Sequence, residues 1–325
     1  VHGDTRREVD LSALDAYLTF GYVPEEHCIL NGVKKLRPGH WLRFRKGSIS
    51  TRQYWDFDLR EPDPRPDEEE WAVRVREAIR DSVRARLISE VPLGAFLSGG
   101  IDSSTIVGVM SELSDKPVKT FSIGFNEDSF DELKFARLAS KRFKTDHHEF
   151  IVTPDLFDAL ETIVTHFDEP FADQSSLPTF MLSKMAREHV TVVLSGDGGD
   201  ELFGGYSRYI IEQDRDRFDS LPSAIRRGFL RPISRMLPHG AYGKNLLHNI
   251  SLDPIDRYLD NVSSFNALKR PRLYSQETKA AMNGSGSAAE AIFKGLTEKG
   301  SDLDPLAKLL YLDCKTYLPG DILTK

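Results

Sequence analysis

The sequence predicts an α/β protein, in which a parallel sheet has helices on both faces, a helical extension follows it and a small β-containing piece precedes it. Short apolar runs of strand length alternate with amphipathic stretches between residues 93 and 194, and strands that alternate with helices form parallel sheets covered on both faces. Glycine-rich polar loops follow two of these runs. The strand pattern fades after about residue 215, so the remainder is expected to be helical.

The composition narrows the functional classes. Of 325 residues, 40% are hydrophobic and 29% charged, which fits a globular protein and excludes disordered and collagen-like chains. Lys and Arg number 43 against 50 Asp and Glu, a net charge of −7, so nucleic acid is not expected as a partner, because phosphate backbones require a basic surface. No window approaches the roughly 18 apolar residues of a transmembrane helix, so no membrane partner is expected.

The cysteines and the chain ends give expectations about location and completeness. Cys28 and Cys314 are the two cysteines. Neither lies at metal-ligand spacing, which favours a reducing, cytoplasmic location over a disulfide framework or a zinc site. The chain begins Val-His-Gly, with neither an initiator Met nor an apolar leader, and it ends abruptly. We therefore expect a piece of a longer protein.

The first elements are predicted from turn residues and periodicity. Residues 11–58 carry short apolar runs punctuated by Gly and Pro, and 41–45 form a strand that enters a turn at 46–48. Residues 61–70 hold three prolines and six acids, which indicates a linker whose acids suit the first turn of a helix. Apolar residues at 72, 75, 79, 83 and 87 predict that helix.

The central elements then alternate. We expect strands at 93–97, 118–124, 148–152 and 190–194, and helices at 102–113, 131–143, 154–165 and 176–188. Ligands of such sheets bind beyond the carboxyl ends of the strands, so chemistry is expected in the loops after residues 97, 124 and 194. Residues 283–288 are expected to form a surface loop.

The first candidate loop is 98–104, Ser-Gly-Gly-Ile-Asp-Ser-Ser. Its glycines allow a ligand to approach the backbone, and its hydroxyls and helix-start N–H groups can donate to phosphate oxygens. A carboxylate at the helix start, Asp102, would repel a phosphate unless a divalent cation lay between them, so Asp102 predicts Mg²⁺. The alternative is a plain turn in which Asp102 or Ser103 caps the helix. The strand, the hydroxyls and the acid together favour the anion site.

The second candidate loop, 195–206, also follows a strand and holds five glycines and three acids. Such a backbone requires a ligand or metal to organise it. Two loops at one sheet edge would face each other, so that Asp102 and Asp200 could share a metal bound to the phosphates of one nucleotide. The alternative is a solvated turn in which Asp200 caps the next helix.

Three further segments carry weaker predictions. Apolar residues at 120–125 could contact a base, although core packing is the commoner role. His147, His148 and Glu149 look like a metal cluster, but neighbours on a strand point to opposite faces, so the histidines are expected to be structural. Part of 168–176, which holds Ser and acidic caps, could line the pocket.

The two loops together resemble a known family. Residues 98–104 look like the pyrophosphate loop of the ATP pyrophosphatases, and with 195–201, Ser-Gly-Asp-Gly-Gly-Asp-Glu, they resemble the synthetase domain of glutamine-dependent asparagine synthetases. Upstream residues resemble the tail of the family's N-terminal glutaminase domain. The other matching segments are 17–24, 36–40, 130–132, 145–149 and 168–170.

The resemblance implies an adenine nucleotide alpha hydrolase-like fold and an asparagine synthase (glutamine-hydrolysing) type of carbon–nitrogen ligase. In that activity ATP and Mg²⁺ convert aspartate into β-aspartyl-AMP, and ammonia from glutamine displaces AMP. The implied pyrophosphate contacts are Ser98, Gly99, Gly100, Asp102, Ser103 and Ser104. The implied adenosine contacts are Phe96, Leu97, Ile123, Ser195 and Gly196. Asp102 and Asp200 would be metal ligands, Asp197 would lie near the acyl intermediate, and Lys325 is the candidate transition-state lysine.

The resemblance also implies a division of the chain. Residues 1–58 would be a glutaminase remnant, 59–70 a linker and 71–325 a synthetase domain truncated at its C-terminus. The family's glutaminase nucleophile is an N-terminal Cys, a role that neither cysteine here inherits, so glutamine hydrolysis is expected to be absent. A homodimer is compatible with the resemblance.

Other functions stay open. A relative that adenylates another carboxylate, such as a β-lactam-forming synthetase or an amidotransferase of surface-polysaccharide biosynthesis, would have the same loops. A non-catalytic nucleotide-binding module is a second alternative, and the two metal-facing acids argue against it. A dinucleotide oxidoreductase is rejected because no Gly-x-Gly-x-x-Gly follows the first strand.

Overall fold

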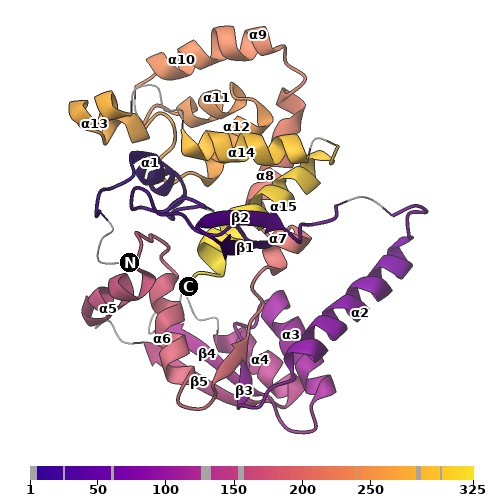
Figure 1. Cartoon of the computed structure of the whole chain (residues 1–325). Helices are drawn as coiled ribbons and strands as arrows, with labels where there is room; N and C mark the ends of the chain where they lie inside the picture. Colours follow the sequence, from indigo (N-terminus) through magenta and orange to yellow (C-terminus); the bar gives the residue numbers. More distant parts are fainter. Residues whose placement is uncertain are drawn as a thin grey trace. The chain divides into compact units, whose positions relative to one another are not determined.

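The computed structural model describes residues 6–24, 26–59, 62–125, 133–152, 157–238, 240–282, 287–300 and 302–325 (Figure 1). The chain divides into two compact units, each assembled from segments distant in sequence. The sheet unit comprises 60–166, 174–199 and 325, and the helical unit comprises 1–59, 167–173 and 200–324.

The core of the sheet unit is a four-stranded parallel sheet in the order β5-β4-β3-β6. Its strands are β3 (Leu93–Phe96), β4 (Lys119–Phe125), β5 (Asp146–Val152) and β6 (Val192–Leu194). In the register, Phe96 lies opposite Phe121 of β4, and Ala95 lies opposite Leu194 of β6. The loops after β3 and β6 therefore leave the sheet side by side, and the predicted α/β class is confirmed.

Helices cover both faces of this sheet. Ala95 and Leu97 belong to a buried cluster with Val107 of α3, whereas Phe96 packs with Phe121 on the opposite face. Successive strand residues point to opposite sides, so this division shows two covered faces. The helices are α2 (Glu68–Arg86), α3 (Ile101–Leu113), α4 (Leu133–Phe143), α5 (Phe157–Phe167) and α6 (Ser176–Ala186).

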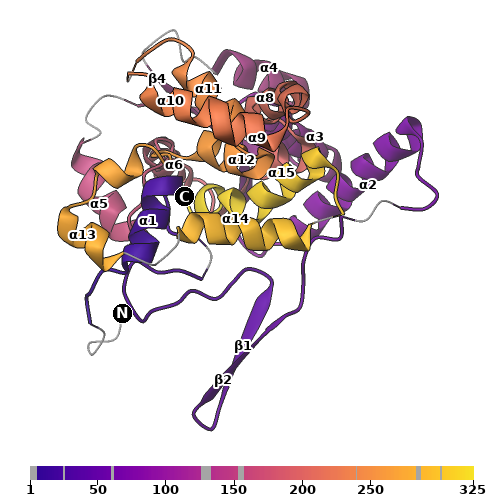
Figure 2. The same cartoon turned by 90° about the horizontal axis from the view of Figure 1, so that it is seen from above.

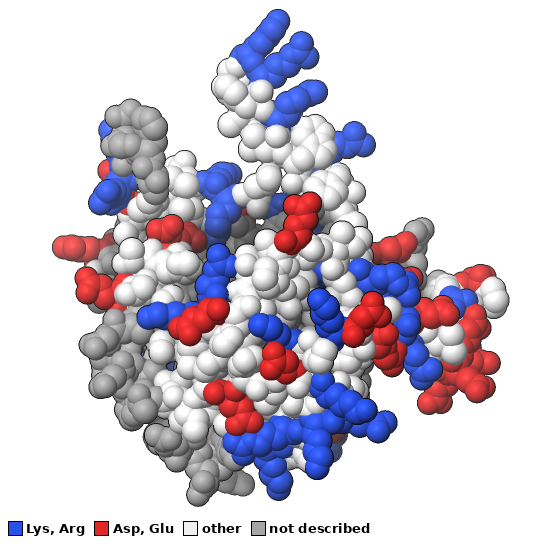
Figure 3. All heavy atoms as spheres, turned by 90° about the horizontal axis from the view of Figure 1, so that it is seen from below, with Lys and Arg blue, Asp and Glu red and all other residues white. Residues whose placement is uncertain are grey.

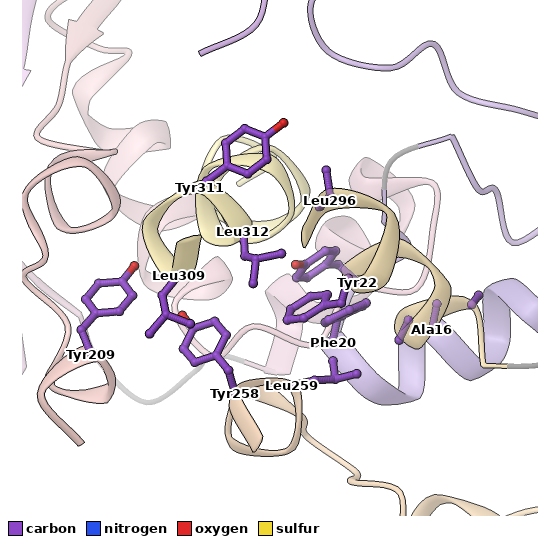
Figure 4. Packing of buried hydrophobic residues seen from close by; sticks show 13 residues of the cluster. Ala16, Phe20, Tyr22, Tyr209, Tyr258, Leu259, Leu296, Leu309, Tyr311 and Leu312 are labelled. Atoms are coloured by element: carbon purple, nitrogen blue, oxygen red, sulfur yellow. The ribbon is translucent and has the colours of Figure 1, made fainter. Parts of the chain in front are cut away.

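The helical unit has its own apolar core, shown in Figure 4. Phe20 stacks on Tyr22 and on Phe293, with ring centroids 5.5 and 5.7 Å apart. Figure 2 shows helices of this unit from above. They are α1 (Leu11–Phe20), α7 (Gly199–Phe203), α8 (Ser207–Arg215), α9 (Ser223–Ile225), α10 (Arg231–Met236), α11 (Lys244–Ile250), α12 (Pro254–Val262), α13 (Gln276–Ala281), α14 (Ala288–Lys299) and α15 (Pro305–Lys315). Short 3₁₀ turns lie at Asp216–Phe218 and Arg270–Arg272, and π turns at Arg226–Leu230 and Leu318–Ile322.

A buried carboxylate joins three of these helices. Asp313 of α15 is 1% exposed. It accepts hydrogen bonds from Nη2 of Arg208 at 2.7 Å and from the hydroxyls of Tyr209 and Tyr258 at 2.5 Å each. Buried charges are stable only when paired and hydrogen-bonded, so Asp313 fixes α8 and α12 against α15.

A β-hairpin projects from the helical unit (Figure 2). Its strands are β1 (His40–Arg45) and β2 (Ser48–Gln53), and Lys46 and Gly47 both have positive φ, as a two-residue hairpin turn requires. The predicted strand and turn are confirmed. Basic side chains gather at its outer end (Figure 3); the exposed basic residues are Arg43, Arg45, Lys46 and Arg52.

The N-terminal piece contains a helix that the periodicity alone did not reveal. α1 begins after Asp10, whose carboxylate accepts hydrogen bonds from the N–H groups of Ser12 and Ala13. It ends at Gly21, which has φ 87°. An acidic N-cap and a left-handed glycine C-cap are ordinary helix boundaries, so both boundaries were visible in the sequence.

Several other boundaries also differ from the prediction by a few residues, among them the following two. β6 begins at Val192 rather than at 190, because the N–H of Val190 bonds to the carbonyl of Ala186 in a turn that follows α6. Of the expected loop 283–288, residues 283–286 lie outside the described residues, while Ala288 already belongs to α14. Within the described residues, no helix combines the length and the apolar character needed to cross a bilayer.

Candidate active site

The first candidate loop connects β3 to α3. At Gly99 the backbone has φ 82°, and a Cβ there would collide with the backbone of Phe135 and Ala136 in α4. Glycine fits this position because it accepts the left-handed conformation and has no side chain. Gly99 therefore fixes the path along which the chain turns from the strand into the helix.

α3 starts directly after this turn without a capping side chain. Its N-cap is Gly100, so the alternative in which Asp102 or Ser103 caps the helix is wrong. An uncapped N-terminus leaves backbone N–H groups that can bind an anion. Ser98 is exposed and Ser104 is half-buried at this point of the chain, so both residues retain accessible surface, and their contact with a phosphate stays a prediction.

Ser103 is more deeply buried than Ser98 and Ser104. It is buried, its Oγ lies 2.9 Å from Oγ of Ser98, and it accepts a hydrogen bond from the Ser98 N–H at 3.3 Å. The hydroxyl of Ser98 in turn accepts from the N–H of Gly100 at 3.3 Å. Ser103 therefore holds the loop together from inside.

The two candidate loops contact each other within the sheet unit. A Cβ at Gly196 would lie 2.7 Å from the backbone nitrogen of Ser103, and a Cβ at Gly199 would lie 2.5 Å from Cγ of Asp102. Carbon atoms in contact lie about 3.5 to 4.0 Å apart, so both positions exclude a larger residue in this arrangement. The carboxyl group of Asp102 thus lies against the second loop, at the residue that precedes Asp200 in the chain.

The acids of the second loop are placed in different ways. The hydroxyl of Ser195 donates to Oδ2 of exposed Asp197 at 2.6 Å. Asp200 lies inside the first turn of α7 rather than before it, so it is not the N-cap. Asp102 belongs to the sheet unit and Asp200 to the helical unit, and a metal shared by these two carboxylates stays a prediction.

Glu201 is an acid of this loop for which no role was predicted. It is 1% exposed, and the hydroxyl of Tyr206 donates to its Oε1 at 2.7 Å. Burial raises the pKa of the Glu201 carboxyl above its ordinary value, and burial together with the contact to Glu201 raises the pKa of Tyr206. The pair anchors α7, the helix that carries Asp200.

The apolar residues expected at adenosine differ in accessibility. Leu97 is 1% exposed in the core cluster, and its N–H donates to the carbonyl of Phe121 at 2.9 Å. Phe96 and Ile123 are half-buried, and Phe96 lines a cavity of about 600 Å³ with Val193. The structure therefore gives Leu97 a core role, while Phe96 and Ile123 retain accessible surface.

The neighbouring histidines have structural partners. Nδ1 of His147 lies 2.9 Å from the hydroxyl of Thr120, and burial lowers the pKa of His147. His148 lies with its ring centroid 4.2 Å from that of His189, and Glu149 pairs with Arg137. Across the described residues, no group of three or more His, Cys, Asp or Glu is arranged to hold a metal.

Residues 167–173 belong to the helical unit. Glu169 accepts hydrogen bonds from the N–H of Ile29 at 2.9 Å and from Nζ of Lys35 at 2.7 Å. With Tyr22 and Gly320 it lines a cavity of about 330 Å³ in that unit. This segment thus lines a cavity of the helical unit, and its place at the predicted nucleotide pocket stays a prediction.

Neither cysteine has the environment of an activated thiol. Burial raises the pKa of Cys314 to about 12, and burial also raises the pKa of Cys28. Reactive cysteines have lowered pKa values, so neither is suited to nucleophilic attack. Lys325 is half-buried and groups with the sheet unit.

Two family models together cover most of the chain. The asparagine synthase model matches residues 74–325, and the glutamine amidotransferase domain model matches residues 1–55. The two matches follow the chain in sequence order, whereas the compact units interleave. The domain boundaries at 58 and 70 stay a prediction.

Curated relatives agree with these models. Asparagine synthetase (glutamine-hydrolyzing) 1 of Bacillus subtilis is 36% identical over 98% of this chain and 49% of its own length. A putative asparagine synthetase (glutamine-hydrolyzing) of Mycobacterium tuberculosis is 34% identical over 98% and 48%. The NH3-dependent NAD synthetase structure from Campylobacter jejuni is 12% identical, with a TM-score of 0.31 over 80% of this chain and 96% of that one. The chain spans about half the length of the curated relatives it matches.

Proposed function

This chain belongs to the asparagine synthase family, and on that premise we propose that it carries the ATP-dependent half of asparagine synthesis. An oxygen of the aspartate side-chain carboxylate bonds to the α-phosphorus of ATP, and the bond to pyrophosphate breaks. The nitrogen of ammonia then bonds to the acyl carbon of β-aspartyl-AMP, the acyl–oxygen bond breaks, and AMP leaves as a proton passes to solvent. The observation that supports this proposal is the contact of the two loops beside Asp102.

The first loop would hold the pyrophosphate part of ATP. The uncapped N-terminus of α3 supplies N–H donors, and Ser98 and Ser104 add hydroxyls. Ser103 fixes the loop from inside. Phe96, Ile123, Ser195 and Gly196 would surround the adenosine, and Leu97 would support them from the core.

Mg²⁺ would be bound by Asp102 and Asp200. Carboxylate oxygens are the ligands that this hard cation prefers, and Gly199 leaves the carboxyl of Asp102 the space that a side chain would fill. When bound, the ion would neutralise the phosphate charge that otherwise repels the attacking carboxylate. Of the remaining groups, Asp197 would lie near the acyl intermediate, and Lys325 would stabilise the charge that develops there.

Ammonia would come from glutamine in a glutaminase reaction supplied by sequence outside this chain. Residues 1–55 match a glutamine amidotransferase domain, yet the pKa values of both cysteines are raised. The proposed small-molecule partners are therefore ATP, aspartate and ammonia. A cytoplasmic location and a homodimer remain predictions.

Pyrophosphate exchange tests this function. The purified protein, with Mg²⁺, is expected to exchange labelled pyrophosphate into ATP when aspartate is present and far more slowly with succinate or glutamate. Asp102→Asn should lower the exchange rate about 100-fold, on the scale of a lost electrostatic contact to a transition state. The matched variant Asp115→Asn, at an exposed acid after α3, should exchange like the wild type. Equal exchange without aspartate would overturn the proposed substrate.

A further inference from the structure

A second cavity lies wholly within the helical unit. Its volume is about 160 Å³, and most of its lining residues come from α10, α11, α12, the 3₁₀ turn Arg270–Arg272 and α14. Figure 1 labels these four helices. Sites that take drug-sized ligands measure roughly 300 to 1,000 Å³, so this cavity is too small for a nucleotide. A ligand of a few heavy atoms fits.

Two buried nitrogen atoms that belong to its lining residues lack a partner. Nε of Arg231 and Nδ1 of His248 are both inaccessible to solvent, and neither has a hydrogen-bond partner among the described residues. His248 is 4% exposed, and its Nε2 lies 3.3 Å from Oδ1 of Asp260. In the neutral imidazole with Nε2 as the donor in that bond, Nδ1 is an acceptor. Leaving such a buried group unpaired is destabilising, which favours a ligand at this place.

The cavity also presents charges of both signs. Arg231 and Arg235 line it from α10, and Asp256 and Glu290 line it from α12 and α14. In the part of the chain that the structure describes, none of these four forms an ion pair. Burial raises the pKa of the Asp256 carboxyl, and the charge of Arg231 opposes this rise. Asp256 and Arg231 therefore interact electrostatically.

Two other charged lining residues are already engaged. Nε of Arg270 lies 2.6 Å from Oδ1 of Asp15, and its Nη1 donates to the hydroxyl of Thr19 at 2.6 Å. Asp260 faces His248. These groups form the wall of the cavity. The charges available to pair with a ligand are those of Arg231 and Arg235 and those of Asp256 and Glu290.

We propose that this cavity binds a free α-amino acid. Its carboxylate pairs with the guanidinium groups of Arg231 and Arg235, since arginine suits planar carboxylates. Its ammonium group is held by Asp256, Glu290 and the acceptor Nδ1 of His248. A dicarboxylate would be repelled by the two cavity acids, and a diamine would leave the two cavity arginines unpaired. A zwitterion is therefore the class of ligand that pairs with both the acids and the arginines. The site shares no residue with the two candidate loops, and the inference does not depend on the proposed function.

Hydrogen–deuterium exchange localises the binding. Glycine, L-asparagine and L-aspartate are added separately to the purified protein, and succinamate serves as the analogue of asparagine without an ammonium group. At least one of the three amino acids is expected to slow exchange at least threefold in peptides from residues 244–262, whereas succinamate at the same concentration leaves it unchanged.

Variants decide whether the charged groups are responsible. Arg235 and Glu290 are exposed, so Arg235→Met and Glu290→Gln should leave the thermal unfolding midpoint unchanged and each abolish the protection. Arg217→Met, at an exposed arginine of the same unit outside the cavity, should retain it. The proposal is overturned if none of the three amino acids protects these peptides, if succinamate protects them equally, or if both cavity variants are protected like the wild type.

Discussion

Replacing Gly199 with alanine perturbs Asp102 without touching it directly. The new Cβ would lie 2.5 Å from Cγ of Asp102 and 2.8 and 2.9 Å from its carboxylate oxygens. Since contacting carbons lie about 3.5 to 4.0 Å apart, the carboxyl group must move by about 1 Å. A displacement of that size at a reacting centre costs about 100-fold in rate, which corresponds to about 2.7 kcal/mol. We therefore expect Gly199→Ala to lower aspartate-dependent pyrophosphate exchange about 100-fold.

The fold should tolerate this change. Gly199 starts α7 and its φ lies outside the left-handed region, so alanine can adopt its backbone conformation, which by itself stabilises by about 0.4 to 1 kcal/mol. The free energy of unfolding from urea titration should change by less than about 1 kcal/mol. Gly228→Ala is the matched control, because a Cβ there meets nothing within 4 Å. Exchange within threefold of the wild type, in a folded Gly199→Ala protein, would refute the placement of Asp102.

Three further predictions concern stability. Gly99→Ala should lower the free energy of unfolding by about 3 kcal/mol or more, because its Cβ collides with the backbone of α4 and its φ is 82°; urea titration measures this, and a loss below about 1 kcal/mol would contradict it. Asp313→Ala should cost about 3 to 5 kcal/mol, because it leaves Arg208 and two tyrosine hydroxyls without their acceptor; an unchanged thermal midpoint would show that the network adds nothing. Burial raises the pKa of Glu201 in the folded state, so the native protein binds more protons there than the unfolded chain and loses stability as pH rises above about 4.5. Glu201→Gln should remove this loss and raise stability at pH 7 relative to pH 4, and parallel stability curves of the two proteins from pH 4 to 7 would rule out the effect.

The strand, loop and helix around residues 93–113 could be predicted because their causes are local. An apolar strand, two glycines and an amphipathic helix follow one another in the sequence. The structure differs from that prediction by one residue at the strand end, Phe96, and by one at the helix start, Ile101. The meeting of the loops followed from topology, since β3 and β6 are parallel neighbours. The loops can approach so closely because Gly196 and Gly199 have no side chains. This reason could be seen only in the structure.

The rest depends on contacts between residues far apart in the chain. Asp313 accepts hydrogen bonds from Arg208, Tyr209 and Tyr258, which lie 105, 104 and 55 positions away in the sequence. No local sequence pattern indicates such a network. The same holds for segment 167–173, which packs with the helical unit although its neighbours in sequence belong to the sheet unit. The core position of Leu97 could not be predicted either, because an apolar residue at the end of a strand suits either a core or a ligand pocket.

Transfer of oxygen from aspartate to AMP tests the central claim, that this chain's loops adenylate the side-chain carboxylate of aspartate. The purified protein is supplied with ATP, Mg²⁺, ammonium and aspartate labelled with ¹⁸O in its side-chain carboxylate. When ammonia displaces AMP from β-aspartyl-AMP, the bridging oxygen leaves with the phosphate. Mass spectrometry should therefore find one ¹⁸O in each AMP and none in pyrophosphate. Label in inorganic phosphate, or asparagine formed with unlabelled AMP, would contradict the account.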